Sequence, residues 1–206
     1  AFTLGKDFIN GEPCAMILGD NIFYGNGFTK LLKNATADAQ KGKATVFGYY
    51  VNDPERFGVV DFDKDGKAVS IEEKPEHPKS NYAVTGLYFY PAGVSEKAAQ
   101  VKPSARGEVE ITSLNEMYLN EDNLNVQLLG RGYAWLDTGT MRSLVDASNY
   151  VKMVEERQGV SISAPEEIAY IHGWISKDKL LEAAKHYGKS PYGKHLKSVA
   201  EGKLRY

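Results

Sequence analysis

"CAMILGDNIFYG", residues 14–25, is an apolar run that stops abruptly at Gly19 and the carboxylate Asp20. A continuous apolar run this short is typical of a strand buried on both faces of a sheet. Because burying a charge is costly, a carboxylate at the end of such a strand needs a reason. In open α/β sheets, ligands bind in the crevice outside the carboxyl ends of the strands. Asp20 is therefore a candidate binding residue, and the start of a loop turn is the alternative.

The sequence after this stretch predicts a helix and then a second strand. Beyond the Gly-rich turn, apolar residues recur at helical spacing, namely Phe28, Leu31, Leu32 and Ala35. The apolar segment 44–51 is then predicted to be a strand. Together with the strand expected at 15–18, these elements predict a right-handed parallel βαβ unit.

The middle of the chain predicts more strands. Asp65-Gly66 stands between the alternating segments 57–63 and 68–74, which together predict a β-hairpin. Another central strand is expected over 82–90. A helix is expected over 109–121, and two further strands within 125–129 and 133–139. This order predicts an α/β fold with a mixed, mostly parallel Rossmann-like sheet flanked by helices.

The pattern becomes wholly helical from Thr140 onward. Apolar residues repeat there at three- and four-residue steps, namely Leu144, Ala147, Val151 and Val154. Ser176 is expected to cap a later helix that ends at Gly188. We therefore expect an α/β core over 1–157 and a C-terminal helical subdomain over 158–206.

Composition excludes several classes of protein. The 206 residues carry 25 Lys and Arg against 27 Asp and Glu, so the formal net charge of −2 disfavours a nucleic-acid partner. The single cysteine, Cys14, cannot form an internal disulfide or a thiolate zinc site, and it suits a cytoplasmic setting. The four histidines lack ligand spacing. No apolar run approaches the ~18 residues of a membrane span, so no membrane partner is expected.

A second carboxylate, Asp137, repeats the arrangement of Asp20. In "YAWLDTGT", residues 133–140, an apolar segment leads to Asp137 and then to a small turn before the long helix. Two acids at strand ends can meet over one crevice, where their repulsion is tolerable only with a cation between them. Oxygen ligands with room for water suit Mg²⁺ best. Capping of the following helix explains Asp137 equally well.

A third polar cluster lies in "IEEKPEHPKSN", residues 71–81, where a strand ends in Glu73 and Lys74 just before Pro75. Such a pair is usually solvated and contributes little to stability. The same pair could hold a sugar phosphate, because an ammonium can meet the phosphate while a carboxylate accepts hydroxyl hydrogens.

Arg106 stands beside Gly107, just ahead of a helix with the early acids Glu108 and Glu110. It could reach into a cleft as a fork for a phosphate. Pairing with the neighbouring acids is the simpler interpretation at this stage.

Several motifs in order resemble one known family. They are "LGDNIFYG", "ERFGVVDFD", "IEEKPEHPKSNYAVTGLYFY", "GEVEITSLN" and "WLDTGT", and "APEEIAYIHGWI" extends the likeness into the tail. Together they resemble the sugar nucleotidyltransferases, and within them the glucose-1-phosphate thymidylyltransferases of the dTDP-rhamnose pathway. The resemblance implies a Mg²⁺-dependent attack of glucose 1-phosphate on the α-phosphorus of dTTP, which gives dTDP-glucose and pyrophosphate without a covalent enzyme intermediate.

The resemblance also implies which residues form the site. The implied metal ligands are Asp20 and Asp137. The implied sugar-phosphate site consists of Glu73 for a glucose hydroxyl, Lys74 and Arg106 for the phosphate, and main-chain contacts from Gly58 and Val84. Asp20, Asp137, Lys74 and Arg106 are the residues expected to act in catalysis. A homotetramer and feedback inhibition by dTDP-rhamnose are expected by resemblance only.

The chain departs from the family pattern at its start. Family members begin with a strand, a Gly-rich loop with a basic residue that cradles the triphosphate, and a Gln-bearing loop that reads thymine. Here "AFTLGKDF" corresponds to the helix after those loops, and no G-x-G-x-R stretch occurs. We therefore expect a fragment that alone lacks dTTP-dependent turnover, because the donors that stabilise departing pyrophosphate are missing. An exposed apolar sheet edge that promotes association is also expected.

Two alternatives stay open at this stage. One is an enzyme of the same class that uses UTP or CTP. The other is a non-catalytic sugar-phosphate-binding or oligomerisation module, against which the two intact acids weigh.

Overall fold

The computed structural model describes residues 1–104 and 106–204. The chain forms two compact units, Ala1–Ser143 and Leu144–Tyr206. All strands of the described residues lie in the first unit, and the described elements of the second unit are helical. The expected domain boundary between residues 157 and 158 stays a prediction.

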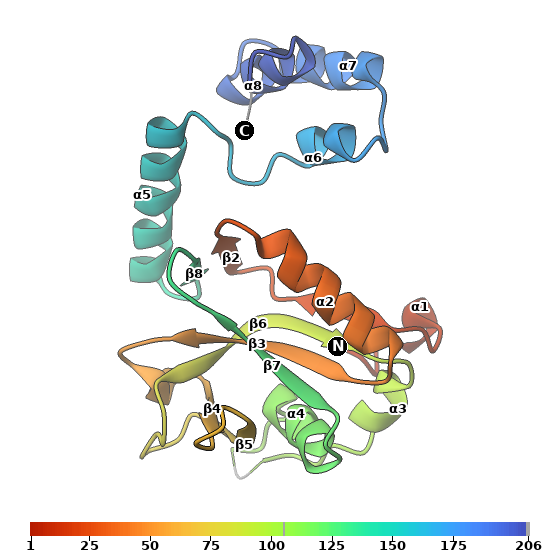
Figure 1. Cartoon of the computed structure of the whole chain (residues 1–206), viewed down its shortest axis with the longest axis vertical. Helices are drawn as coiled ribbons and strands as arrows, with labels where there is room; N and C mark the ends of the chain where they lie inside the picture. The colour runs from red at the N-terminus through yellow and green to blue at the C-terminus, as the bar shows by residue number, and fades with distance from the viewer. Residues whose placement is uncertain (105, 205–206) are drawn as a thin grey trace. The chain divides into compact units, whose positions relative to one another are not determined.

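The first unit contains a six-stranded sheet and a separate two-stranded ribbon (Figure 1). The sheet order is β5-β4-β6-β3-β7, and β1 pairs with the C-terminal part of β6. The strands of the sheet are β1 Cys14–Ile17, β3 Ala44–Tyr50, β4 Gly58–Phe62, β5 Ala68–Glu73, β6 Tyr82–Tyr90 and β7 Leu124–Leu129. The ribbon pairs β2, Asn21–Tyr24, with β8, Ala134–Asp137.

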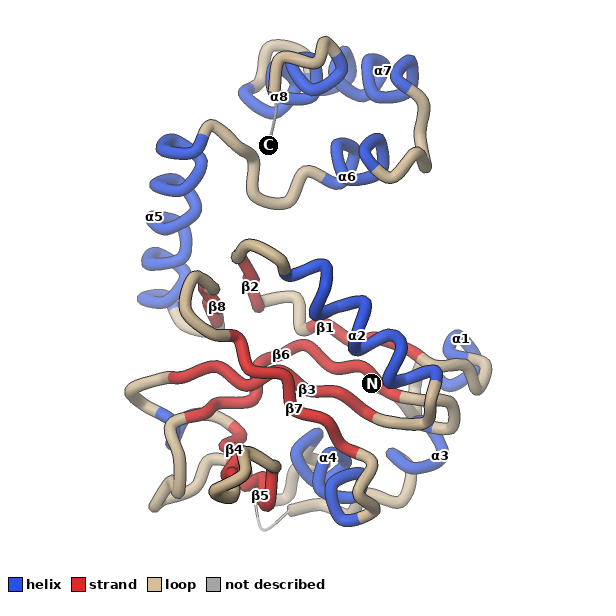
Figure 2. The backbone as a smooth tube through the Cα atoms, viewed as in Figure 1, coloured by secondary structure: helices blue, strands red, loops and turns tan. Residues whose placement is uncertain are grey.

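Helices lie on both faces of the sheet (Figure 2). One face is covered by α2, Phe28–Gln40, and the other by α4, Ile111–Asn120, together with α3, Val94–Ala98 (Figure 2). The remaining helical elements of this unit are α1 Lys6–Ile9 and the 3-10 helix η1 Pro54–Arg56. This arrangement confirms the predicted α/β class with a mixed sheet flanked by helices.

The expected parallel character of the sheet is wrong for the described strands. β6 runs antiparallel to β1, β3 and β4, and only β3 with β7 forms a parallel pair. β1 and β3 do point the same way, as the βαβ prediction requires. They are not neighbours, because β6 inserts between them. A strand inserted from 65 residues further along the chain leaves no trace in the local sequence pattern of either neighbour.

β1 is also not buried on both faces. Its side chains alternate, so Cys14 and Met16 pack against the core while Ala15 and Ile17 are exposed, Ile17 to 59%. Alternation of this kind marks a strand with one covered face. Among the described strands, β1 pairs with β6 alone. The sequence could not show this alternation, because all four residues of "AMIL" are apolar.

The predicted hairpin is confirmed by antiparallel pairing of β4 with β5. Gly66 adopts a left-handed φ of 79° in the connecting turn, which glycine tolerates without steric cost. Asp63 Oδ1 accepts hydrogen bonds from Asp65 N and Lys67 N, both at 2.9 Å. The hairpin brings Gly58 opposite Glu73, two of the predicted site residues.

The core divides into two layers because strand side chains alternate between faces. On β3, Val46 joins the layer beneath α4, which includes Leu114 and Tyr118. The next residue, Phe47, joins the opposite layer beneath α2, which includes Ala35. The helix predicted over 109–121 therefore buries the apolar face expected of it.

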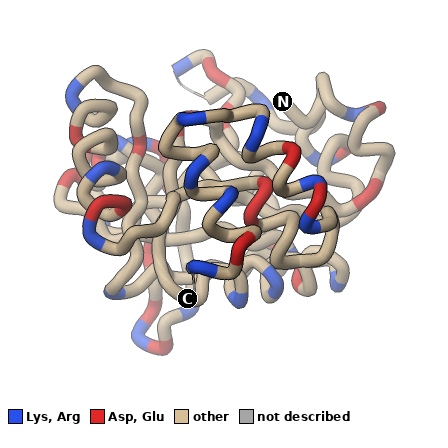
Figure 3. Tube along the Cα trace, turned by 90° about the horizontal axis from the view of Figure 1, so that it is seen from above, with Lys and Arg blue, Asp and Glu red and all other residues tan. Residues whose placement is uncertain are grey.

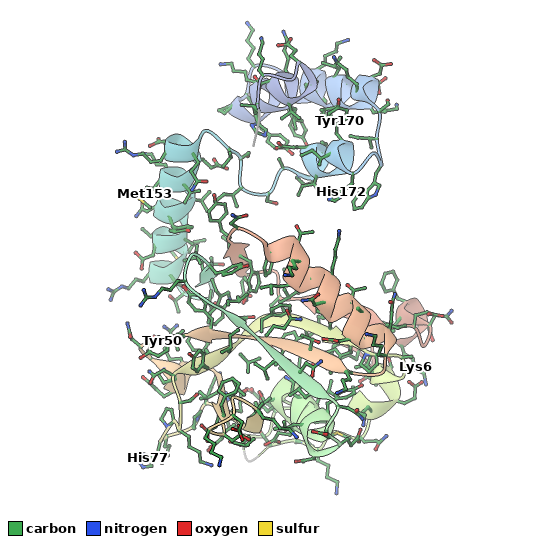
Figure 4. The ribbon with its side chains drawn as sticks, in the orientation of Figure 1. Lys6, Tyr50, His77, Met153, Tyr170 and His172 are labelled. Carbon is green, nitrogen blue, oxygen red and sulfur yellow. The ribbon has the colours of Figure 1, made fainter. Side chains whose placement is uncertain are left out.

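The second unit comprises most of α5, Met141–Gln158, followed by three shorter helices. These are α6 Pro165–Ile171, α7 Lys177–Tyr187 and α8 Pro191–Ala200, and the side chains of α6 include Tyr170 (Figure 4). α7 and α8 enclose a core made of Leu180, Ala184, Leu196 and Ala200. Oε2 of the buried Glu167 and Nε2 of the half-buried His195 lie 2.6 Å apart, and this contact joins α6 to α8.

The charges of the described residues are mixed rather than segregated. Basic and acidic positions are interspersed along the trace (Figure 3), in keeping with the small net charge. Within residues 1–104 and 106–204, no helix combines the length and the apolar character that a membrane crossing requires.

Replacing Ser176 with Ala is expected to lower the free energy of unfolding of the helical unit by about 1 kcal/mol. Ser176 Oγ accepts a hydrogen bond from Lys179 N at 3.3 Å, which confirms the predicted cap. Ser176→Asp keeps an acceptor and adds a charge that suits the helix start, so it should retain stability. Urea denaturation followed by circular dichroism measures both variants. An equal loss in both would contradict the capping role.

Candidate active site

The two carboxylates predicted to share an ion lie together at the ribbon of β2 and β8. Asp20 immediately precedes β2, Asp137 is the last residue of β8, and the antiparallel register sets Asn21 opposite Asp137. Thr138 N and Oγ1 both donate to Asp20 O at 2.9 Å. A Cβ atom on Gly139 would lie 3.0 Å from Asp137 Oδ1 and 3.6 Å from Asp20 Oδ2. Both carboxylates therefore border the same small space.

The cause of this convergence differs from the predicted one. The sequence predicts that Asp20 and Asp137 meet because each stands at the end of a strand, over one crevice of the sheet. Instead, β1 belongs to the six-stranded sheet and β8 to the ribbon. The acids meet because β2 starts directly after Asp20 and runs antiparallel to β8.

A cavity of about 240 Å³ opens beside the two carboxylates. Its walls come from η1, β4, β5, β6, α4 and the ribbon, with the turns next to them. The predicted site residues that line it are Asp20, Gly58, Glu73, Lys74, Val84 and Asp137. The chain thus gathers at one cavity every predicted site residue except Arg106. Their individual roles stay predictions.

Arg106 does not line the cavity, and its guanidinium is paired with acids, one of which is Glu73 of the cavity wall. Its Nη1 atom lies 3.8 Å from Glu73 Oε1 and 3.5 Å from Glu110 Oε1, and Nη2 lies 3.5 Å from Glu108 Oε2. The other Glu73 oxygen, Oε2, accepts a hydrogen bond from Thr112 Oγ1. Pairing with neighbouring acids, the simpler of the two interpretations from sequence, is therefore the arrangement in this structure.

Lys74 has an unusual backbone for a residue at a cavity wall. Its φ is 44°, in the left-handed region that non-glycine residues rarely adopt. Lys74 also precedes Pro75, and a residue before proline normally has an extended backbone. Lys74 N donates to Phe57 O at 2.9 Å, which ties the end of β5 to the start of β4. Strained residues of this kind cluster at functional sites.

Sequence reasoning missed several residues of the cavity wall. Asn21, Arg56, Tyr88 and Trp135 all line it. Asn21 directly follows the predicted site residue Asp20 in "GDN", and this adjacency is a signal that the sequence alone contains. Trp135 and Tyr88 resembled ordinary apolar strand residues, and only the folded chain turns them toward the site.

The phenol of Tyr88 in the cavity wall has a shifted pKa. Burial raises the pKa of its phenol, and the nearby carboxylates of Glu73 and Asp20 raise this pKa further, because negative neighbours disfavour the phenolate. Tyr88 is therefore a neutral hydroxyl at physiological pH, able to donate one hydrogen bond. The cavity wall carries three carboxylates, Asp20, Glu73 and Asp137, together with the basic residues Arg56 and Lys74.

The donor set fits Mg²⁺. Among the described residues, no group of three or more His, Cys, Asp or Glu side chains could hold a metal ion. His77, for example, lies in the loop after β5, away from the ribbon (Figure 4). Mg²⁺ needs less, because proteins usually bind it through one or two carboxylates and leave the remaining positions to water and substrate phosphates. Asp20 and Asp137 supply those two carboxylates.

An α/β sheet flanked by helices, with paired acids beside a cavity, is the arrangement that the resemblance to the sugar nucleotidyltransferases implies. The family model described as Nucleotidyl transferase matches residues 1–153. The solved structure of apo UDP-glucose pyrophosphorylase has a TM-score of 0.63 at 24% identity, over 75% of this chain and 59% of that one, and so shares the fold.

More similar relatives narrow the class. A glucose-1-phosphate thymidylyltransferase of Xanthomonas campestris pv. campestris (strain B100) is 53% identical over 201 residues, which are 98% of this chain and 68% of the relative. One of Neisseria gonorrhoeae is 55% identical over 197 residues, 95% of this chain and 67% of the relative. A solved structure from Bacillus anthracis, assigned to the same enzyme and in complex with a sucrose, has a TM-score of 0.61 at 41% identity.

The chain belongs to the glucose-1-phosphate thymidylyltransferase family, as the motifs predicted. It covers 68% of the length of the Xanthomonas relative. Of the Bacillus anthracis structure it covers 58%, with 72% of this chain aligned.

Proposed function

We propose that the protein transfers a thymidylyl group from dTTP to glucose 1-phosphate, giving dTDP-glucose and pyrophosphate. The observation that carries this proposal is the approach of the Asp20 and Asp137 carboxylates to one space beside a cavity that also contains Glu73 and Lys74. The names of the similar relatives support the choice of sugar and nucleotide.

In this reaction a phosphate oxygen of glucose 1-phosphate attacks the α-phosphorus of dTTP. The bond from that phosphorus to the oxygen shared with the β-phosphate breaks, and pyrophosphate leaves. Asp20 and Asp137 would hold Mg²⁺, which when bound supplies Lewis-acid stabilisation of the phosphate charge. Positioning of the two substrates provides much of the remaining acceleration, so no covalent enzyme intermediate is needed.

The sugar phosphate would bind along the wall formed by β4, β5 and β6. Glu73 would accept a hydrogen bond from a glucose hydroxyl, and the Lys74 ammonium would meet the phosphate. Gly58 and Val84 would contact the sugar through their main chain. Arg106 would add a two-pronged contact to the phosphate once its guanidinium leaves the neighbouring acids.

Glucose 1-phosphate binding tests this proposal on the chain itself. We expect calorimetry to detect binding with Mg²⁺ present and to lose it in EDTA or in Asp20→Asn, because that change removes one of the two charges that hold the ion. Asp65→Asn, on the exposed β4–β5 turn, removes the same charge elsewhere and should bind normally. Equal binding with and without Mg²⁺, and in both variants, would contradict the proposal.

Finer features rest on the family resemblance alone. They include a cytoplasmic location, a homotetramer, supply of dTDP-glucose to the dTDP-rhamnose pathway and inhibition by dTDP-rhamnose. The UDP-glucose pyrophosphorylase likeness, at 24% identity, concerns the fold and does not favour UTP. A nucleotide-preference assay on the intact gene product separates dTTP from UTP and CTP.

A further inference from the structure

We propose that Asn21 is a positioning residue that orients the Asp20 carboxylate toward the ion shared with Asp137. This inference rests on the proposed function, because it assumes that Asp20 is a metal ligand. Asn21 itself was not among the predicted site residues, and its hydrogen bonds single it out.

The Asp20 side chain needs something to hold it. Asp20 lies on an exposed turn between β1 and β2. Asn21 Nδ2 donates to Asp20 Oδ1 at 2.8 Å. The other oxygen, Oδ2, is the one that lies 3.6 Å from a Cβ built on Gly139, on the side where Asp137 also stands. The two oxygens of Asp20 thus divide their tasks: Oδ1 is held by Asn21, and Oδ2 faces the shared space.

Asn21 can serve as an anchor because its own carbonyl is fixed from two directions. Asn21 Oδ1 accepts from Trp135 Nε1 at 2.6 Å and from Gly86 N at 3.0 Å. Trp135 belongs to β8 and is 8% exposed, and Gly86 is a buried residue of β6. The amide therefore links β6, β8 and the turn that carries Asp20.

The backbone at Gly86 leaves room for this link. A Cβ atom there would come within 2.6 Å of Asn21 Oδ1, closer than any real contact permits. Gly86 O accepts from Leu18 N at 2.8 Å, so the strand pairing uses the carbonyl and Asn21 uses the N–H. Any side chain at this position would displace the Asn21 carbonyl.

Removing a residue that hydrogen-bonds a metal ligand commonly weakens metal affinity by about 10- to 100-fold. Mn²⁺ is a suitable probe, because electron paramagnetic resonance counts the free ion without substrate or turnover. We expect Asn21→Ala to raise the Mn²⁺ dissociation constant of the chain about tenfold. Trp135→Phe keeps an aromatic ring and removes only one donor to Asn21, so it should raise this constant about threefold, a smaller effect of the same kind.

A double-variant cycle separates positioning from a merely structural role. If Asn21 acts through Asp20, then adding Asn21→Ala to Asp20→Asn should change Mn²⁺ affinity no further. Unchanged affinity in Asn21→Ala, with clear weakening in Asp20→Asn, would overturn the inference and leave the proposed metal site intact. Unchanged affinity in both Asp20→Asn and Asp137→Asn would overturn the proposed metal site itself. If Asn21→Ala does not fold, Trp135→Phe decides: unchanged affinity there overturns the inference.

Discussion

Asp137→Asn is expected to lower the rate of pyrophosphate release by the intact gene product about 10³-fold, equal to roughly 4 kcal/mol of transition-state stabilisation. Asparagine keeps the shape of the side chain and an oxygen that can still accept from Gly139 N, at 2.8 Å in this structure. What it removes is one of the two negative charges that would hold Mg²⁺. The rate is measured with both substrates saturating and Mg²⁺ titrated into the millimolar range.

The control for this variant is Asp65→Asn, which makes the same chemical change on the exposed β4–β5 turn. It should leave the rate unchanged. Circular dichroism should show Asp137→Asn folded, since Asp137 pairs at the end of the short β8 and no core cluster includes it. A loss smaller than tenfold, in protein that is folded, would mean that Asp137 is not a metal ligand.

The position of the paired acids could be predicted from sequence, but not the geometry that joins them. Each acid follows a short apolar run, which is a local signal for a strand end. The ribbon that joins them depends on β2, whose four residues "NIFY" all lie at intermediate burial and show no alternation. A strand that short carries too little pattern to reveal its partner, β8, which lies far along the chain.

Arg106 and Asn21 show, in opposite ways, how far the sequence can predict the contacts of a site residue. Motif resemblance assigns Arg106 to a phosphate, yet in this structure its guanidinium contacts three carboxylates, because the acids at 73, 108 and 110 surround it. Asn21 stood in the opening motif but gained its significance only from Gly86 and Trp135, which come from distant strands. Hydrogen-bond networks across elements are set by long-range register, and single-sequence patterns do not contain it.

The prediction of a mostly parallel sheet was wrong for a related reason. The run at 15–18 is apolar at every position, so its letters fit a strand buried on both faces as well as one that alternates. Whether one face or both faces of this strand are buried depends on what covers each face and on which strand pairs beside it. β6 supplies that neighbour, and it runs antiparallel.

The helical unit offers the largest stability effect, at Gly193 in the first turn of α8. A Cβ atom at this position would lie 2.6 Å from Gly188 O and 3.0 Å from Ala184 O. Both are backbone atoms at the end of α7, so no side-chain rotation can relieve the contact. Gly193→Ala should therefore push α8 away from α7 and cost about 3 kcal/mol of unfolding free energy, the upper part of the range for overpacking.

This cost is large relative to what so small a helical unit can supply, because few apolar side chains stabilise it. We expect amide hydrogen exchange in α7 and α8 to accelerate strongly in Gly193→Ala, while exchange in β3 and β6 stays unchanged. Gly130→Ala is the matched control, since no atom lies within 4 Å of its Cβ position and its φ is ordinary. Unchanged protection of α7 and α8 in Gly193→Ala would show that the close approach of the two helices does not hold this unit together.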